Sequence, residues 1–336
     1  MVKRKPRKSN YLNGKSLLIT GGTGSFGKRF IQIILKEYKV KRLVVFSRDE
    51  LKQEEMRTMG GFNDPRLRYF IGDVRDKERL YRALHEIDFI VHTAALKQVA
   101  SGEYNPIELV KTNISGAENI INAAIDTSVK KVIALSTDKA VNPINLYGAS
   151  KLVAEKLFIQ GNNYSDLKFG TKFACVRYGN VVGSRGSVVL LFGHQKENGE
   201  ITITDDRMTR FWITLDEGVR IVIRALENMR GGEIFIPKIP SMKVIDLARS
   251  IAPKCKIKII GIRPGEKIHE VLISEDEAKN TYETNDMYII RPVNLFHEPA
   301  NPIWKKSRKM AEPSFTSNNN TNWLTMKNLK QMIKDI

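Results

Sequence analysis

The chain has 336 residues, of which 42% are hydrophobic and 27% charged, as expected for a globular protein with a sizeable core. No apolar run approaches the roughly 20 residues that span a bilayer, and no secretory signal is recognisable, so we expect a cytoplasmic protein without membrane insertion. The two cysteines, Cys175 and Cys255, lie far apart and lack companions at metal-ligand spacing, so we expect reduced thiols and no metal site.

The net charge of +18 comes from 55 basic and 37 acidic residues. Such an excess suits an acidic macromolecular partner, or a surface that attracts small anions such as nucleotide diphosphates. Part of the excess lies in the runs Lys3–Lys8 and Lys305–Lys309, which are typical of solvated segments. No aromatic motif for RNA recognition is present, so we expect no nucleic-acid partner. A surface-attachment role for the basic ends stays open.

The first half of the chain alternates apolar runs of strand length with helical patterns. Six buried strands are predicted at Ser16–Thr20, Leu43–Ser47, Leu67–Ile71, Phe89–Thr93, Val132–Ser136 and Phe173–Tyr178. Helices are predicted at Phe26–Glu37, Lys77–Leu84, Ile107–Ile125 and Gly148–Phe158. This alternation predicts an α/β fold with a doubly wound parallel sheet of the Rossmann type and helices on both faces.

Shorter elements follow Tyr178, and they predict a smaller C-terminal substrate lobe interleaved with the sheet domain. Helices are expected near Thr214–Asn228 and Val244–Ile251, with a strand at Glu233–Ile236. The polar segment 293–322 reads as an extended or partly disordered strap before a short helix capped near Thr325. The predicted organisation is a basic tail at 1–13, an NADP-binding Rossmann domain at 14–180 to which part of 205–236 returns, a mainly substrate-binding lobe at 181–292, and the strap and helix at 293–336.

A glycine-rich loop follows the first predicted strand directly. Glycines at 21, 24 and 27 allow a backbone to approach a pyrophosphate, and the helix behind them aims its first amides at that anion. Because a strand precedes the loop and a helix follows it, we predict dinucleotide binding there. The residues concerned are Gly21, Thr23, Gly24, Ser25, Phe26 and Gly27.

The end of the second predicted strand indicates which dinucleotide is bound. An acidic residue there would bind an NAD ribose, whereas the hydroxyl of Ser47 and the guanidinium of Arg48 suit the 2′-phosphate of NADP. Asp49 follows at once and leaves NAD as an alternative. Asp73 and Val74, after the third strand, are placed to receive the adenine, although Asp73 could instead cap the next helix. We expect NADP.

A tyrosine and a lysine follow a later parallel strand. Tyr147 and Lys151 are four residues apart, so on a helix they share one face. A nearby ammonium lowers the pKa of a phenol, which lets a tyrosinate accept a proton near neutral pH. That is the chemistry needed to oxidise a sugar alcohol by hydride transfer to a nicotinamide. We therefore predict catalytic roles for Tyr147 and Lys151.

With these features the chain resembles the extended short-chain dehydrogenase/reductase superfamily, and within it the inverting UDP-N-acetylglucosamine 4,6-dehydratases of the pseudaminic acid pathway. The match runs from about Lys15 to Glu270. The segments that carry the closer resemblance are His92-Thr-Ala-Ala-Leu-Lys97-Gln98-Val99, Ser136-Thr-Asp-Lys-Ala-Val-Asn-Pro143, Arg177-Tyr-Gly-Asn-Val181, Ser184-Arg-Gly-Ser187 and Met208-Thr-Arg-Phe211. Retaining dehydratases of the dTDP-glucose type carry Asp-Glu in place of Asp138-Lys139, and large membrane-linked dehydratases carry Met in place of Tyr147.

The resemblance implies a mechanism with bound NADP that is regenerated in every turnover. Tyr147 takes the proton of the C4 hydroxyl while Thr137 holds O4. Lys139, if neutral, removes the C5 proton, and Asp138 protonates the departing C6 hydroxyl. The expected product is a 4-keto-6-deoxy sugar inverted at C5, UDP-2-acetamido-2,6-dideoxy-β-L-arabino-hexos-4-ulose. The residue that returns a proton to C5 stays open.

The resemblance also implies further binding residues and an assembly. Ala94, Ala95, Lys97 and Tyr178 would join Tyr147 and Lys151 in contacting the cofactor. The substrate UDP-N-acetylglucosamine would contact Lys97, Asn180, Arg185, Ser187, Thr204, Met208, Arg210, Arg263 and Glu266. Relatives form homo-oligomers, so a dimer or hexamer is expected.

For several of these residues, a role outside catalysis and ligand binding stays open. Asp138 and Lys139 could form a surface ion pair, Lys97 could be a solvated lysine, and Arg263 with Glu266 could form a structural salt bridge. For the whole chain, the alternatives are a retaining dehydratase, a UDP-hexose 4-epimerase, and a non-catalytic NADP-binding protein with an acidic or RNA partner.

Overall fold

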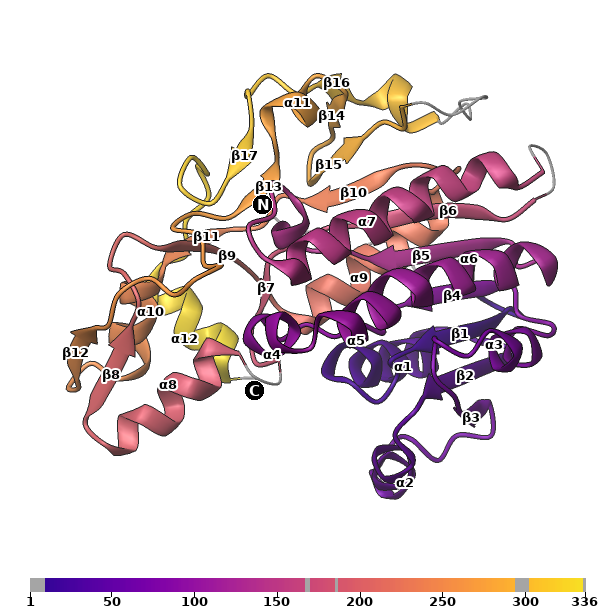
Figure 1. Cartoon of the computed structure of the whole chain (residues 1–336), viewed down its shortest axis with the longest axis horizontal. Helices are drawn as coiled ribbons and strands as arrows, with labels where there is room; N and C mark the ends of the chain where they lie inside the picture. The colour runs from indigo at the N-terminus through magenta and orange to yellow at the C-terminus, as the bar shows by residue number, and fades with distance from the viewer. Residues whose placement is uncertain (1–9, 167–169, 185–186, 294–301, 335–336) are drawn as a thin grey trace.

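The computed structural model describes residues 10–166, 170–184, 187–293 and 302–334, and these contain a ten-stranded sheet. The parallel part of the sheet has the order β3-β2-β1-β4-β5-β6-β10 (Figure 1). Its strands are β1 (Ser16–Thr20), β2 (Arg42–Ser47), β3 (Leu67–Ile71), β4 (Phe89–His92), β5 (Lys131–Leu135), β6 (Lys172–Val176) and β10 (Ile234–Pro237). This order confirms the predicted doubly wound Rossmann-type sheet.

Helices cover both faces of this sheet. On one face α1 (Ser25–Glu37) packs against α9 (Leu215–Asn228), and on the other α6 (Gly116–Asp126) lies between α3 (Lys77–Ala83) and α7 (Leu146–Gln160) (Figure 1). A capping box at Thr214 starts α9, whose buried face is built from valine, isoleucine and leucine. Helix α9 lies in the connection between β6 and β10, so the second half of the chain returns to the first domain.

Among the described residues, four α-helices were not predicted, and one predicted helix is divided. The unpredicted helices are α2 (Glu50–Thr58), α4 (Val99–Tyr104), α8 (Val188–Glu197) and α11 (Glu275–Ala278). In α2 only Gln53 and Met56 are buried, so its sequence has little apolar periodicity. The helix predicted at 107–125 consists of α5 (Pro106–Val110), a π-helical turn over Lys111–Ser115, and α6.

A second hydrophobic core lies in a smaller lobe. There α8 (Val188–Glu197), α10 (Val244–Ile251) and the parallel pair of β8 (Glu200–Ile203) with β12 (Lys256–Ile259) enclose Phe192, Met208 and Trp212. A small sheet of β7 (Asn180–Val181), β9 (Thr209–Ile213) and β11 (Ser241–Lys243) joins this lobe to the main domain. The prediction of a smaller interleaved C-terminal lobe is therefore confirmed.

The described part of the strap binds along three parts of the molecule. First, β16 (Arg308–Lys309) extends an antiparallel edge of the large sheet beyond β15 (Met287–Ile290) and β14 (Thr281–Glu283). Then β17 (Phe315–Thr316) pairs with β13 (Val271–Ile273). The strap ends in α12 (Met326–Lys334), where the Thr325 hydroxyl accepts a hydrogen bond from the Asn328 amide at 3.2 Å, as the predicted cap requires.

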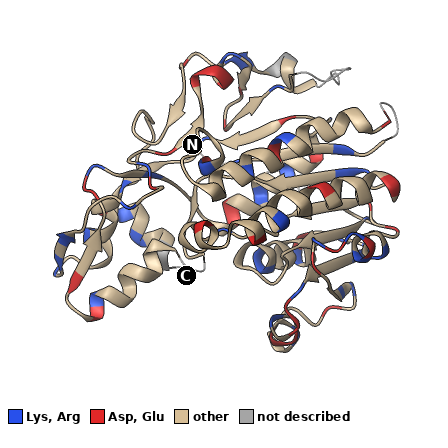
Figure 2. Cartoon of the chain, viewed as in Figure 1, with Lys and Arg blue, Asp and Glu red and all other residues tan. Residues whose placement is uncertain are grey.

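The charged side chains do not gather on one element. Lysine and arginine are distributed over the sheet domain and the smaller lobe, with acidic residues between them (Figure 2). The predicted basic tail at 1–13 falls mostly outside the described residues. Among the helices that the structure describes, none has the length and apolar character needed to cross a bilayer.

Candidate active site

The glycine loop between β1 and α1 forms a close-packed turn. At Gly27 a side-chain carbon would come within 2.4 Å of the Gly22 carbonyl oxygen, so only glycine allows α1 to start this close to the loop. The first turn of α1 thereby faces the cavity that the loop lines. This geometry fits the pyrophosphate of a dinucleotide, which binds to amides at a helix N-terminus.

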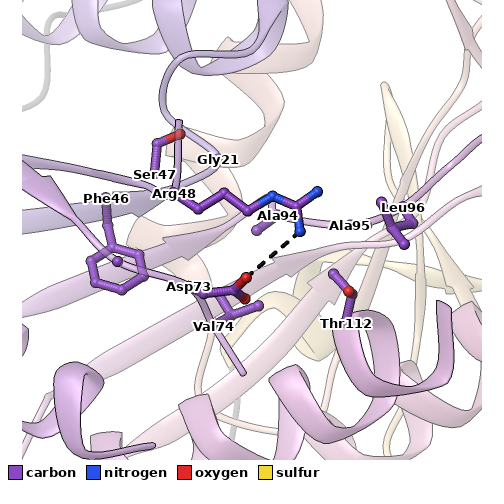
Figure 3. Close-up of a pocket in the computed structure, with 11 residues that line it drawn as sticks. Gly21, Phe46, Ser47, Arg48, Asp73, Val74, Ala94, Ala95, Leu96 and Thr112 are labelled. Atoms are coloured by element: carbon purple, nitrogen blue, oxygen red, sulfur yellow. Dashed lines mark ion pairs between the residues drawn. The ribbon is translucent and has the colours of Figure 1, made fainter. Parts of the chain in front are cut away.

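A pocket beside the loop fits the adenosine end of such a cofactor. Its lining residues include Gly21, Phe46, Ser47, Arg48, Asp73, Val74, Ala94, Ala95 and Thr112 (Figure 3). The Thr112 hydroxyl is buried and has no hydrogen-bond partner among the described residues, so a polar ligand group would satisfy it. The predicted cofactor residues at the ends of four neighbouring strands, β1 to β4, therefore meet in one place.

The polar groups of this pocket bear on the choice of cofactor and on the role of Asp73. The Arg48 guanidinium extends across the pocket to 3.6 Å from the Asp73 carboxylate (Figure 3), and the Ser47 hydroxyl lies 3.0 Å from that of Thr23. Asp49 is engaged elsewhere, because its carboxylate accepts from the Lys52 amide at 3.0 Å and caps α2. The cap of α3 is Asp76, so the alternative that Asp73 caps this helix is wrong.

A cavity of about 590 Å³ continues from the loop towards the smaller lobe. The predicted residues that line it are Gly21, Thr23, Gly24, Ser25, Phe26, Gly27, Ala94, Ala95, Lys97, Thr137, Asp138, Lys139, Tyr147, Lys151, Tyr178, Asn180 and Ser187. All five predicted catalytic residues are therefore brought to one cavity together with the glycine loop. Lys97 lines the cavity with its side chain exposed to solvent, and partial burial lowers its pKa, so the alternative of a solvated lysine stays open.

Five of the predicted substrate residues lie outside this cavity lining, namely Thr204, Met208, Arg210, Arg263 and Glu266. Met208 is buried in the second core, and the Arg210 guanidinium donates to the carbonyls of Thr209, Lys267 and Ile268. Glu266 accepts from the backbone amide of Arg263 at 3.4 Å. Arg185 lies outside the described residues. Substrate binding by these residues stays a prediction.

The catalytic turn joins β5 to α7. Residues Asp138–Ala140 form a single 3₁₀ turn directly after the strand, and α7 begins at Leu146 with its N-cap at Asn145. A side-chain carbon on Gly148 would come within 2.2 Å of the Lys139 carbonyl oxygen, so this glycine lets the helix pack on the turn. Tyr147, in the first turn of α7, is thereby held beside Asp138 and Lys139.

Asp138 and Lys139 form a buried ion pair with a third partner, Glu270. The Lys139 ammonium lies 3.1 Å from a carboxylate oxygen of Asp138 and 3.1 Å from one of Glu270. The Asp138 side chain is only 1% exposed, so the alternative of a surface ion pair is wrong. Burial raises the pKa of Asp138; burial lowers that of Lys139, but the two carboxylates outweigh this and raise it above its ordinary value.

Tyr147 and Lys151 interact differently from the prediction. Burial raises the pKa of Tyr147, and the cation that opposes this effect is Lys139. The Lys151 ammonium donates to the Leu135 carbonyl at 2.6 Å, and burial lowers its pKa. A hydrogen bond with Thr137 also lowers the pKa of Tyr147, and the Thr137 hydroxyl lies 2.9 Å from an Asp138 carboxylate oxygen.

Comparison with known proteins identifies the family. Residues 17–292 match the family described as polysaccharide biosynthesis protein. A relative from Campylobacter jejuni subsp. jejuni serotype O:2, the UDP-N-acetylglucosamine 4,6-dehydratase (inverting), is 53% identical over 96% of this chain and 98% of its own length. The chain belongs to the polysaccharide biosynthesis protein family. The resemblance found in the sequence motifs is thereby confirmed.

Other proteins to which the chain is similar have different names. A UDP-glucose 4-epimerase of Rickettsia canadensis is 40% identical, over 95% of each chain. The crystal structure of Pen from Bacillus thuringiensis is similar with a TM-score of 0.87 and 40% identity, over 96% of this chain and 98% of that one. Because one fold serves both epimerases and dehydratases here, the side chains in the cavity must distinguish the two activities.

Sequence analysis missed Glu270, which lies just before β13 and is 2% exposed. A lone glutamate in a segment of short strands has no local signal of burial. The sequence contains only an indirect indication of its role. A buried lysine needs a compensating charge, and Glu270 is the last residue of the segment that resembles the dehydratases. Glu270 and Lys139 are far apart in the sequence, and only the tertiary fold brings them into contact.

Proposed function

We propose that the chain is a UDP-N-acetylglucosamine 4,6-dehydratase that inverts C5 of the sugar and works with bound NADP. The observation that carries this proposal is the buried pair of Asp138 and Lys139, which lies beside Tyr147 in one cavity. Elimination of water needs an acid and a base in addition to the group that serves the C4 hydroxyl, whereas 4-epimerisation needs only the latter group. The relative from C. jejuni with this name supports the proposal.

The cofactor part of the proposal is supported by the glycine loop and by Arg48. The loop and the pocket beside it fit a nicotinamide dinucleotide, and the guanidinium of Arg48 with the Ser47 hydroxyl favours a 2′-phosphate. Asp49, which would favour NAD, is held in the cap of α2. A bound nicotinamide would supply the hydride chemistry of the reaction, namely oxidation at C4 of the sugar and reduction at C6.

Tyr147 is the proposed base for the C4 hydroxyl. Its burial favours the neutral phenol, so a cation has to offset this effect before the tyrosine can accept a proton. Lys139 supplies that charge in the structure, and Lys151 lines the same cavity. Thr137, which hydrogen-bonds with Tyr147, is placed to hold O4 of the sugar.

Asp138 and Lys139 are the proposed acid and base of the elimination. Burial favours a protonated Asp138, which suits donation of a proton to the departing C6 hydroxyl. Lys139 is an ammonium in the resting site, so it must lose a proton before it can act as a base. The Asp138 carboxylate, 3.1 Å away, can take that proton, and a single transfer prepares both groups.

Product identification by NMR tests the proposal. The enzyme is incubated with UDP-N-acetylglucosamine in heavy water without added cofactor. We expect a 4-keto-6-deoxy product with deuterium at C5 and inverted configuration there. Deuterium at C5 with retained configuration would assign a retaining dehydratase, and a C4 epimer without deuterium would assign an epimerase. In Lys139→Ala we expect loss of the C5 exchange, and unchanged exchange would rule out Lys139 as the base.

A further inference from the structure

Glu270 belongs to a buried cluster of charges at the wall of the active-site cavity. One of its carboxylate oxygens lies 3.1 Å from the Lys139 ammonium and 3.6 Å from Nε of Arg210. The other oxygen, Oε2, is buried and has no hydrogen-bond partner among the described residues. Two cations therefore lie near one oxygen of this buried carboxylate. They keep the carboxylate ionised, because a buried charge without a partner of opposite sign would be very unfavourable.

The strap fixes the backbone on both sides of this carboxylate. The Glu270 amide donates to the Ser317 hydroxyl at 2.9 Å, and the Ser317 amide donates to the Glu270 carbonyl at 2.8 Å. The Ser317 hydroxyl also donates to the Thr209 carbonyl at 3.1 Å, on the strand that carries Arg210. Both Ser317 and Thr209 are buried. The backbone of Glu270 is therefore fixed by the fold at the point from which its side chain reaches Lys139.

We propose that Glu270 is a positioning residue of the elimination step, in which its carboxylate and that of Asp138 hold the Lys139 amine between them at the wall of the sugar site. This inference rests on the proposed dehydratase activity. It assigns to Glu270 no contact with the sugar or the cofactor. Its part is to fix where the amine lies and which carboxylate exchanges a proton with it.

The carboxyl groups of Glu270 and Asp138 differ in the direction of their pKa shifts, as their different roles require. Burial raises the pKa of Glu270, but Lys139 and Arg210 outweigh burial and lower it, whereas the pKa of Asp138 is raised by burial and by the charge of Glu270. The other charged or titratable groups that act on the cluster are Tyr147 and Lys267. Glu270 therefore stays ionised, and Asp138 is the carboxylate that accepts the proton of Lys139.

The proton and electron balance of the step closes within these groups and the substrate. A proton leaves the Lys139 ammonium and forms the O–H bond of Asp138, which leaves a neutral amine. That amine takes the C5 proton, the C5–H electron pair forms the C5–C6 double bond, and the C6–O bond breaks as Asp138 protonates the oxygen, which departs as water. The site returns to an ammonium between two carboxylates, and Glu270 is unchanged throughout.

The variant Glu270→Gln tests this inference because it removes the charge and keeps the side-chain size. Glu283→Gln is the matched control, since Glu283 also pairs with a lysine and an arginine, but neither of these partners lines the cavity. We expect Glu270→Gln to lower kcat about 10- to 100-fold, the cost of a misplaced catalytic group, with KM for the UDP-sugar little changed. The control should keep wild-type kcat and KM.

A second measurement reports on Lys139 without turnover. The rate at which an amine-reactive reagent modifies Lys139 is followed against pH by peptide mass spectrometry. Loss of the Glu270 charge removes one influence that raises the pKa of Lys139, so the labelling midpoint should move to lower pH in Glu270→Gln and stay in place in Glu283→Gln. A purely structural role for Glu270 would not move this midpoint.

An unchanged kcat or an unchanged labelling midpoint in a folded Glu270→Gln enzyme would overturn the inference. Should this variant fail to fold, Ser317→Ala releases the Glu270 backbone while keeping its charge, and a wild-type kcat in Ser317→Ala would overturn the inference equally. Failure of the proposed function shows separately, as absence of a dehydrated product from the wild-type enzyme. The labelling midpoint still tests the contact between Glu270 and Lys139 in that case.

Discussion

Arg48 is the residue on which the proposed preference for NADP depends. Its side chain is 54% exposed and meets one carboxylate at 3.6 Å, so the guanidinium can turn to a phosphate without breaking a buried pair. Arg75 already neutralises Asp73 through a contact of 2.8 Å. Binding of a 2′-phosphate by Arg48 therefore leaves no carboxylate uncompensated.

We predict that Arg48→Ala weakens NADP binding by about 10-fold or more, since a hydrogen bond to a charged group contributes roughly 1.5–3 kcal/mol. Binding of NAD should be unaffected. The two dissociation constants are measured by quenching of protein fluorescence. Arg57→Ala, which removes an exposed arginine of α2 outside both cavities, is the control. Equal weakening of both cofactors would contradict the role given to Arg48.

The residues of the site differ in how far the sequence could predict them. The glycine loop, Arg48 and the pair of Tyr147 and Lys151 follow from local spacing, because a loop or one turn of helix sets their geometry. The ammonium that acts on Tyr147 could not be predicted in this way. Lys139 does so because α7 packs on the catalytic turn, and Glu270 joins it from a segment 131 residues further along the chain. Such contacts depend on the whole fold.

At the scale of elements, the contact between α7 and the catalytic turn leaves almost no space for an added side-chain atom. Gly148→Ala places a carbon 2.2 Å from the Lys139 carbonyl, so the helix must move away from the turn. We expect a loss of stability of about 1–3 kcal/mol and a lower kcat, because Tyr147 moves with the helix. Urea denaturation and steady-state kinetics measure the two effects. Wild-type values for both would show that α7 does not depend on this close approach.

The matched control is Gly193→Ala in the interior of α8. A carbon added at Gly193 meets no other atom within 4 Å. The substitution should therefore stabilise the protein by up to about 1 kcal/mol through helix propensity and leave kcat unchanged.

A buried ion cluster joins α7 to α11 (Glu275–Ala278). The fully buried guanidinium of Arg177, the residue directly after β6, contacts Glu155 of α7 at 2.5 Å and Glu277 of α11 at 2.9 Å. Burial raises the pKa of Glu277, but Arg177 outweighs this and lowers it below its ordinary value. The cluster therefore ties the helix that carries Tyr147 to the C-terminal half of the chain.

This cluster makes stability depend on pH. A carboxyl group with a lowered folded pKa contributes stability that is fully present above its unfolded pKa, about 4.3 for glutamate, and is lost as pH falls through the folded pKa. We predict that Glu277→Gln is less stable than wild type near neutral pH and that the difference disappears in acid. Urea denaturation at several pH values measures it. Glu275→Gln, on the exposed side of the same helix, should show no such trend, and a constant difference for Glu277→Gln would contradict the prediction.

The elements themselves show why the sequence predicted the first half of the chain better than the second. Strands β1 and β3 have the predicted ends: β1 is a fully buried apolar run bounded by turns, whereas β3 lies at the end of the sheet with only Leu67 buried. The sequence did not predict β8, β12 or β17, whose two to four residues carry too little pattern. Helix α10 was predicted at its observed ends, since all its apolar residues fall on one face. Division of the chain into domains at 180 and 292 stays a prediction.

On the scale of the whole molecule, the described residues form two hydrophobic cores, and the strap closes the smaller one. Leu329 of α12 is fully buried in that core and packs with residues of α8 and α10. We predict that Leu329→Ala costs about 2–5 kcal/mol of stability, as for other buried leucines. Met326→Ala, at an exposed position of the same helix, should stay within about 0.5 kcal/mol of wild type. Urea denaturation compares the two, and equal effects would show that α12 does not dock through Leu329.

The strap also has a consequence for how the protein matures. Translation delivers the glycine loop, the catalytic turn and Glu270 well before Ser317 and Leu329, and domains fold as units while synthesis proceeds. The cofactor domain can thus be complete while Glu270 still lacks the backbone partners that hold it against Lys139. We expect the nascent chain to acquire its nucleotide before it acquires its acid–base pair. The nascent chain would then be able to bind its nucleotide before the strap emerges, and it would become active only after the strap has bound.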